Sequence, residues 1–143
     1  MNLFTKITLF INGALLVRFS LSKLFAWPIS VQAFIEMAQP LSLDPTFFRI
    51  STGVIISITC LSYFISFFFG ITKRELRSLK SMLYTLFSNA LGIIVMSGAL
   101  LAEFFLRVQP KWPLVVIAIF IATTSLINLI LLKKIKQKED YSS

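Results

Sequence analysis

The stretch ISTGVIISITCLSYFISFFFGIT, residues 50–72, runs for 23 residues without a charged side chain. Two more uncharged stretches follow it, residues 81–102 and residues 112–132, of 22 and 21 residues. A helix needs about 20 predominantly apolar residues to cross the hydrocarbon core of a bilayer. Because these stretches occupy almost half of a 143-residue chain, little sequence remains for a soluble domain. The pattern predicts a polytopic membrane protein.

A fourth apolar segment opens the chain at about residues 7–27, with Arg18 near its middle. Lys6 before an apolar run resembles a signal peptide, but no small-residue cleavage motif follows, so we expect a retained membrane span. The predicted spans are about residues 7–27, 46–69, 82–106 and 113–132.

Residues 30–39 lie between the first two spans and have apolar side chains at helical spacing. They are too short and too polar to cross, which predicts an interfacial or re-entrant helix, with Ser30 as a candidate cap. Asp44 and Pro45 predict the start of the second span, and Gly70 predicts its end. The predicted fold class is all-α: one transmembrane domain over residues 1–143, an integral membrane four-helix bundle with a short helix between helices 1 and 2.

The formal net charge of +8 is distributed over the ends of the apolar spans and does not form one basic face. This placement indicates membrane topology and argues against nucleic-acid binding. With four spans, nine Lys and Arg residues fall on the side of the two termini and the connector 73–80, and four fall on the other side. The positive-inside rule therefore predicts cytoplasmic termini and a basic cytoplasmic tail at residues 133–143.

The composition disfavours several kinds of catalysis. The chain has one cysteine, Cys60, and no histidine, which argues against a C-x-x-C redox site, a histidine-ligated haem and the usual zinc sites. No Gly-rich phosphate loop and no G-x-S-x-G motif occurs. We expect no metal site and a protein that is not catalytic on its own.

Charged residues inside or beside the spans are candidates for a ligand pocket at the outer end of the bundle. They are Arg18, Lys23, Arg49 and Glu103. A charge at mid-membrane costs about 2.5–3.5 kcal/mol on insertion scales, so Arg18 is expected to face protein, with Glu103 as its partner. The alternative is a set of snorkelling side chains and one structural ion pair.

Amides and small residues supply further candidates. Asn12, Asn89 and Asn128 lie in three different spans, where amides either bond across helices or hold a polar ligand such as a quinone carbonyl. Two small-x-x-x-small pairs on the third span predict close helix packing, inside the chain or between copies. The pairs are Ser88 with Gly92 and Gly98 with Ala102.

The order of these features resembles the DoxX-like family, with its MauE-type relatives. The end of the first span, Leu21-Ser22-Lys23-Leu24-Phe25, is similar to that family's G-x-x-K-L region, although Ser22 or Leu21 stands for the glycine. Further similar features are Phe34, Gly53, the sequence Gly70-Ile-Thr-Lys-Arg74 and Ser97-Gly98-Ala99. The glutamate often found early in the second span is absent, since residues 49–53 read RISTG.

The resemblance implies a small membrane subunit in a bacterial inner membrane, associated with a quinone-linked oxidoreductase or a redox-stress complex. It implies a membrane or peripheral redox protein as partner, with quinone or lipid as candidate ligands. Two alternatives stay open: a homo-oligomeric transporter of an ion or charged solute, and an assembly factor for another membrane protein.

Overall fold

The computed structural model describes residues 2–72 and 79–142, and within them it is helical without strands. The elements are α1 (Leu3–Leu24), α2 (Pro28–Ala38), a single 3₁₀ turn η1 (Gln39–Leu41), α3 (Pro45–Thr72), α4 (Leu79–Phe105) and α5 (Trp112–Ser142). The predicted all-α bundle with a short helix between helices 1 and 2 is confirmed.

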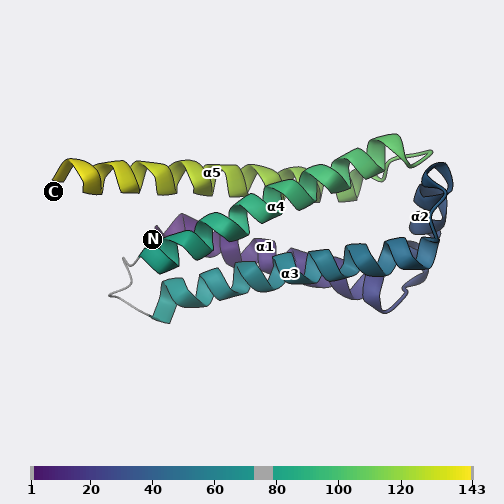
Figure 1. Ribbon diagram of the computed structural model, residues 1–143, viewed down its shortest axis with the longest axis horizontal. Helices are drawn as coiled ribbons and strands as arrows, with labels where there is room; N and C mark the ends of the chain where they lie inside the picture. Colours follow the sequence, from purple (N-terminus) through teal and green to yellow (C-terminus); the bar gives the residue numbers. More distant parts are fainter. Residues whose placement is uncertain (1, 73–78, 143) are drawn as a thin grey trace.

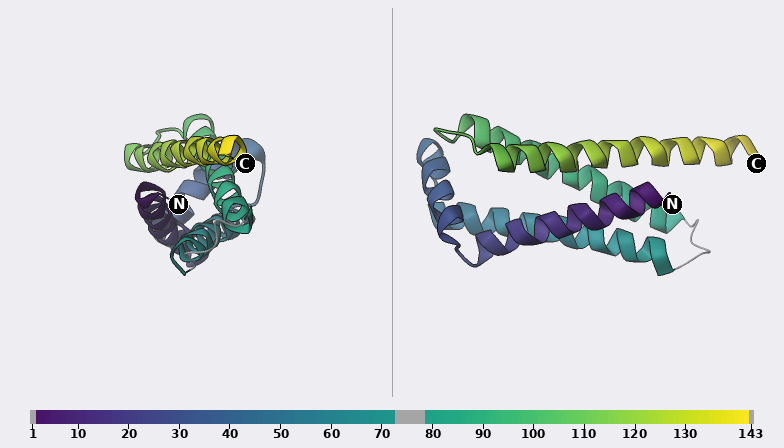
Figure 2. Two further views of the ribbon diagram at one scale, coloured as in Figure 1. Left: turned by 90° about the vertical axis from the view of Figure 1, so that its left-hand side faces the viewer. Right: turned by 180° about the vertical axis from the view of Figure 1, so that it is seen from behind.

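Four long helices run along one axis, and α2 lies across one end of them (Figure 1). We call this end the α2 end. It also carries the α4–α5 turn, while both chain termini lie toward the opposite end. The end-on view in Figure 2 shows the order α1, α3, α4, α5 around the bundle. The closest packing is between α1 and α3, between α3 and α4, and between α4 and α5, so α1 and α4 are diagonal partners.

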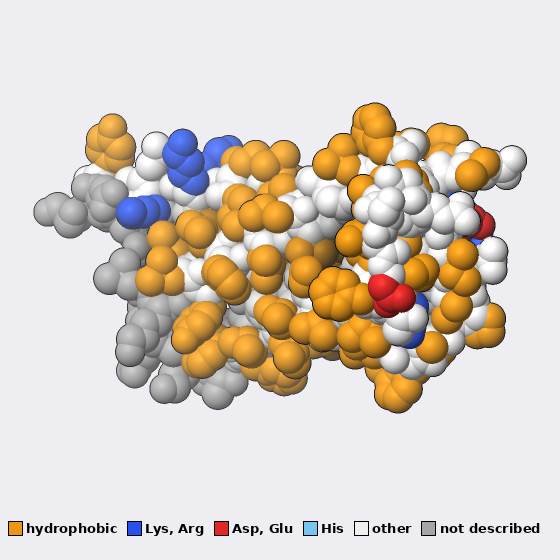
Figure 3. Space-filling view, turned by 45° about the vertical axis from the view of Figure 1, so that its right-hand side comes forward, with side chains coloured by type: hydrophobic (Ala, Val, Ile, Leu, Met, Phe, Trp, Pro, Cys, Tyr) orange, Lys and Arg blue, Asp and Glu red, His pale blue; other side chains and the backbone are white. Residues whose placement is uncertain are grey.

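In the part of the chain that the structure describes, four helices are long and apolar enough to cross a membrane, as the sequence predicts. They are Leu3–Leu24, Pro45–Ile71, Ser81–Phe105 and Trp112–Gln137. Their outward faces carry many exposed large hydrophobic side chains, for example Ile58, Phe87 and Val116. Figure 3 shows hydrophobic side chains over the middle of the surface and charged ones toward its ends. Such a surface suits lipid, which supports an integral membrane protein.

Helix boundaries follow local chemistry, with two corrections. Asp44 caps α3, since the Phe47 N–H donates to its Oδ2 at 2.7 Å and Pro45 is the first helical residue. The prediction that Ser30 caps the short helix is wrong, because α2 begins earlier at Pro28 and buries Ser30. The prediction that Gly70 ends the second span is also wrong, because α3 continues to Thr72.

The helix α5 is longer than its predicted span of residues 113–132. Its 31 residues extend about 46 Å and carry the basic tail beyond the other helices (Figures 1 and 2). The tail sequence contains lysine, glutamine and glutamate, which favour helix, and no Gly or Pro. The basic tail therefore continues the helix of the last span, and where the span ends along α5 stays a prediction.

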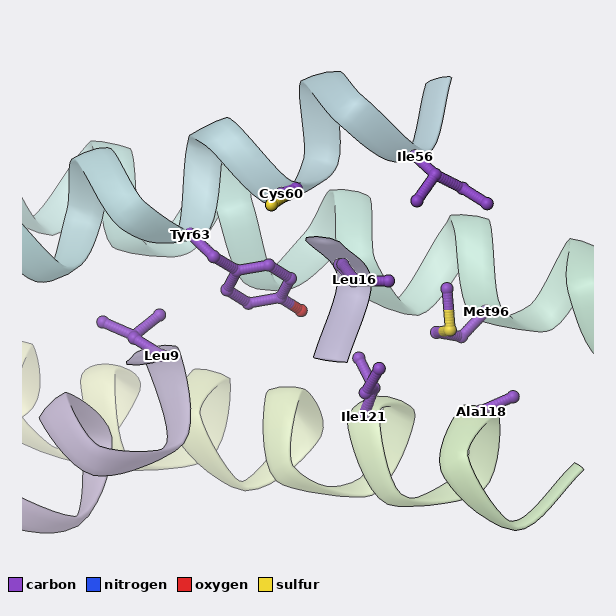
Figure 4. Close-up of a cluster of buried hydrophobic side chains, with 8 residues drawn as sticks. All are labelled: Leu9, Leu16, Ile56, Cys60, Tyr63, Met96, Ala118 and Ile121. Atoms are coloured by element: carbon purple, nitrogen blue, oxygen red, sulfur yellow. The ribbon is translucent and has the colours of Figure 1, made fainter. Parts of the chain in front are cut away.

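The apolar core fills the middle of the bundle (Figure 4). Its buried members come from the four long helices: Leu9, Leu16, Ile56, Cys60, Tyr63, Met96, Ala118 and Ile121. Cys60 is a buried free thiol that donates to the carbonyl oxygen of Gly13 at 3.3 Å. Buried polar side chains lie among these core residues, since Asn12 falls between Leu9 and Leu16 on α1.

Candidate functional site

Charged side chains from four helices gather at the α2 end. We call this set, Lys23, Glu36, Arg49, Glu103 and Arg107, the α2-end cluster. Its centre is an ion pair between Glu103 near the end of α4 and Arg107, four residues later in the α4–α5 turn, in which Arg107 Nη1 lies 2.8 Å from Glu103 Oε1. Arg107 Nε also lies 3.6 Å from Glu36 Oε2, which connects the α4–α5 turn to α2.

The ion pair is buried and well provided with hydrogen bonds. Glu103 is 6% exposed and Arg107 is 8% exposed. The second carboxylate oxygen of Glu103 accepts the backbone N–H of Lys111 at 3.2 Å, which fixes the α4–α5 turn. Charges taken out of water need such compensation, and a buried pair adds little net stability over an apolar replacement. Its contribution here is to hold α2, α4 and the turn in one arrangement.

Lys23 and Arg49 join α1 and α3 to the same region. The Lys23 ammonium lies 5.4 Å from the ring centre of Phe19 and 5.8 Å from that of Phe34, and Glu103 is the carboxylate whose charge acts on it. The Arg49 guanidinium is buried and donates to the backbone carbonyl of Lys23. A cation at the C-terminal end of α1 satisfies a carbonyl that the helix leaves free.

Arg18 does not belong to this cluster, which corrects the sequence prediction. The buried side of α1 includes Leu9, Leu16 and Ser20. Arg18 follows Leu16 by two residues, about 200° around the helix, and is exposed. The diagonal placement of α1 and α4 also works against the predicted pair, and Glu103 takes Arg107 instead. Arg18 lies on the lipid-facing side, where its long side chain can extend toward the headgroups.

The predicted amides lie in a second region, a buried polar network interspersed with the core residues. Asn12 on α1 donates to Thr124 Oγ1 on α5 at 3.1 Å and accepts from the same hydroxyl. Asn128 on α5 donates to Thr8 Oγ1 at 2.9 Å and to Asn89 Oδ1 on α4 at 3.1 Å. All three amides are 0% exposed. Their polar atoms are used between helices, as expected for adhesion in a membrane interior.

Tyr63 and Gly92 complete this network. Tyr63 from α3 is fully buried, and its hydroxyl lies 2.5 Å from Ser125 Oγ on α5. The Tyr63 ring crosses the face of α4 at Gly92, where an added Cβ would lie 1.8 Å from Oη and 2.7 Å from Cζ. Ser88, one turn before Gly92, bonds to Ser66 Oγ on α3 at 3.1 Å. The Ser88 and Gly92 pair therefore packs against α3 inside the chain.

The other small-residue pair behaves differently. Gly98 is exposed, and a Cβ built on it meets no atom within 4 Å. Ala102 is half-buried on the following turn. Of the two predicted kinds of packing, Gly98 does not show the one inside the chain, and packing between copies stays a prediction. This face of α4 leaves a small-residue surface open to lipid or to another chain.

Sequence reasoning missed residues that the fold places at both regions. Arg107 and Glu36 were not among the predicted pocket residues, although the i, i+4 spacing of Glu103 and Arg107 was a usable signal. Nothing in the sequence marked Tyr63 as the residue that spans the bundle to Ser125, because that contact joins positions 62 residues apart. Among the residues that the structure describes, no three His, Cys, Asp or Glu side chains lie close enough to hold a metal ion.

Comparisons with protein-family models, with curated proteins and with solved structures find no match to this chain.

Proposed function

We propose that this chain is a small DoxX-like membrane subunit that acts with a redox partner and is not catalytic alone. The observation that carries the proposal is the self-contained interior. Polar side chains of all four long helices bond to one another, and within the described residues Ser30 Oγ alone among buried side-chain polar atoms has no hydrogen-bond partner. A bundle of this kind acts through its surface. The redox partner, a quinone-linked oxidoreductase or redox-stress complex, is proposed from the family resemblance.

The buried amides favour adhesion between helices over a quinone site. Asn12 and Asn89 are the amides with which a quinone carbonyl would bond, and both donate and accept within the bundle. A quinone or lipid ligand would therefore bind at the surface or between this chain and its partner.

A transporter within a single chain is less well supported. The middle of the bundle is occupied by Leu16, Tyr63 and Ile121, each 0% exposed (Figure 4). A charged solute crossing along the bundle axis would have to displace all three side chains. Transport by a homo-oligomer would instead use a path between copies, for which the exposed small-residue face at Gly98 offers a contact.

We also propose that both termini are cytoplasmic, in a bacterial inner membrane. The positive-inside count supports this orientation. So does the exposure of Lys133, Lys134 and Lys136 on the extended end of α5, where they suit an anionic inner leaflet at about 1 kcal/mol of attraction each.

Purification of the tagged full-length chain in mild detergent tests the functional proposal. A redox protein recovered at constant stoichiometry supports it. Recovery of the chain with itself alone favours the homo-oligomeric transporter, and a substoichiometric membrane-protein client favours an assembly factor. The matched variant is Gly98→Leu. It adds a large side chain to the exposed face of α4 at a position where an added Cβ meets no atom of the chain within 4 Å. Loss of the partner in Gly98→Leu would locate the interface on α4.

A further inference from the structure

A shallow cleft opens at the surface beside the α2-end cluster, between α2 and the α4–α5 turn. Its volume is about 230 Å³, and its lining consists of Gln32, Glu36, Arg107, Gln109, Pro110 and Lys111. Since a water molecule occupies about 30 Å³ of liquid, the cleft has room for a polar group of several heavy atoms. We propose that it binds the headgroup of a zwitterionic aminophospholipid, of the phosphoethanolamine type.

The floor of the cleft is held in place by buried charges. The Arg107 side chain is 4% exposed and is fixed by Glu103 at 2.8 Å. Glu103 also accepts the backbone N–H of Lys111 at 3.2 Å, so the turn that forms one wall is tied to the same carboxylate. Glu36 approaches Arg107 at 3.6 Å from α2 and forms the opposite wall. The two walls are therefore preorganised relative to each other.

The charges on the walls match both ends of the proposed headgroup. Lys111 is exposed and is the cation that a phosphodiester can reach, while Arg107 beneath it is paired with Glu103 and Glu36. The Glu36 side chain is 36% exposed, so its carboxylate remains accessible to an ammonium group. Gln32 and Gln109 add amides that can donate and accept. A glycerol headgroup has the phosphate without the ammonium, and would leave Glu36 without its complement.

The cleft opens at the level expected for the lipid headgroups, which favours a lipid over a soluble phosphate compound. Trp27 directly precedes α2 and Trp112 opens α5, and both are exposed at this end. Tryptophan is enriched at the level of the headgroups. Phe105 at the end of α4 and Val108 in the α4–α5 turn are 79% and 88% exposed and suit the boundary with the acyl chains.

Lipid titration of the delipidated full-length protein in detergent tests the proposal, with the fluorescence of Trp27 and Trp112 and native mass spectrometry as readouts. The three probes are short-chain phosphatidylethanolamine, short-chain phosphatidylglycerol and water-soluble O-phosphoethanolamine. We expect saturable binding of phosphatidylethanolamine, and weaker binding of the other two. Lys111→Gln and Glu36→Gln should each weaken phosphatidylethanolamine binding by roughly tenfold, since each removes one charge-assisted contact.

Lys133→Gln is the matched control, because it removes an exposed lysine on the far part of α5. Its affinity for phosphatidylethanolamine should equal that of the unaltered chain. Glu36→Gln also alters a contact of Arg107, whereas Lys111→Gln leaves the ion pairs of the cluster intact. Unchanged binding in Lys111→Gln would overturn the proposal. Equal binding of phosphatidylglycerol would overturn the role of Glu36, and equally tight binding of O-phosphoethanolamine would assign the cleft to a soluble ligand.

Discussion

Gly92→Ala is predicted to be among the most damaging single-methyl additions to the bundle. The new Cβ would lie 1.8 Å from the Tyr63 hydroxyl oxygen and 2.7 Å from Cζ, both far inside van der Waals contact. The aromatic ring cannot bend to make room, and Tyr63 is fully buried with its hydroxyl on Ser125. The ring or α4 must therefore move, and the contact between α3 and α5 must lengthen or break.

Two costs contribute to the loss of stability. Overpacking a buried site by one methyl group costs about 1–3 kcal/mol. Loss of the Tyr63–Ser125 hydrogen bond adds about 0.6 kcal/mol, the average for such bonds between membrane helices, and at most about 1.7 kcal/mol. The expected loss in the free energy of unfolding is therefore about 2–4 kcal/mol.

Reversible unfolding by SDS in mixed micelles measures this quantity, with Trp27 and Trp112 fluorescence and circular dichroism as signals. Gly98→Ala is the matched control on the same helix, because its Cβ would meet open space. It should be neutral or stabilise by up to about 1 kcal/mol through better helix propensity. Tyr63→Phe removes the atom at 1.8 Å, so Gly92→Ala should cost less in that background. Equal stabilities of Gly92→Ala and Gly98→Ala would refute the reasoning.

Three further predictions concern the charges and the polar network. Glu103→Gln should lower the free energy of unfolding by about 3 kcal/mol, because it leaves buried Arg107 with only the longer contact to α2. Adding Arg107→Gln should recover part of the loss. A double variant that is less stable in SDS unfolding than Glu103→Gln alone would contradict this. Arg18→Leu should keep or raise the yield of folded protein on size-exclusion chromatography, since it removes an exposed charge from an apolar span, and a lower yield would show a partner for Arg18. Asn128→Leu should lose about 1–2 kcal/mol in the same unfolding assay by breaking bonds to α1 and α4, and an unchanged midpoint would show that the network does not stabilise the bundle.

The fold class and the number of spans follow from local sequence features. The length of an uncharged stretch predicts a membrane span without any knowledge of the helices that pack against it. The cap at Asp44 is likewise a contact within one helical turn. The end of α5 was missed because charge marks the end of a membrane span, while a helix of lysine and glutamate continues in water. The site was harder to predict, because the side of each helix that faces the interior depends on the helices that pack against it.

Arg18 and Lys23 illustrate that limit. They are five residues apart, about 140° around the helix, and only the packing of α1 on α3 decides which one turns inward. Lys23 enters the α2-end cluster and Arg18 does not. Glu103 was correctly expected to neutralise basic residues at this end, but its partner is Arg107, four residues later in the turn after its own helix. Contacts between distant positions, such as Tyr63 with Ser125, leave no pattern in a single sequence.

Cysteine labelling with a membrane-impermeant thiol reagent tests the four-span bundle most directly. The native Cys60 is buried in the core and should stay unlabelled in the folded protein. Lys111→Cys lies at the α2 end, and Lys136→Cys lies on the exposed extension of α5. We predict that Lys111→Cys reacts in intact cells and that Lys136→Cys reacts only after the membrane is opened. Labelling of both positions from the same side would contradict the membrane-spanning arrangement of α5 and with it the four-span bundle.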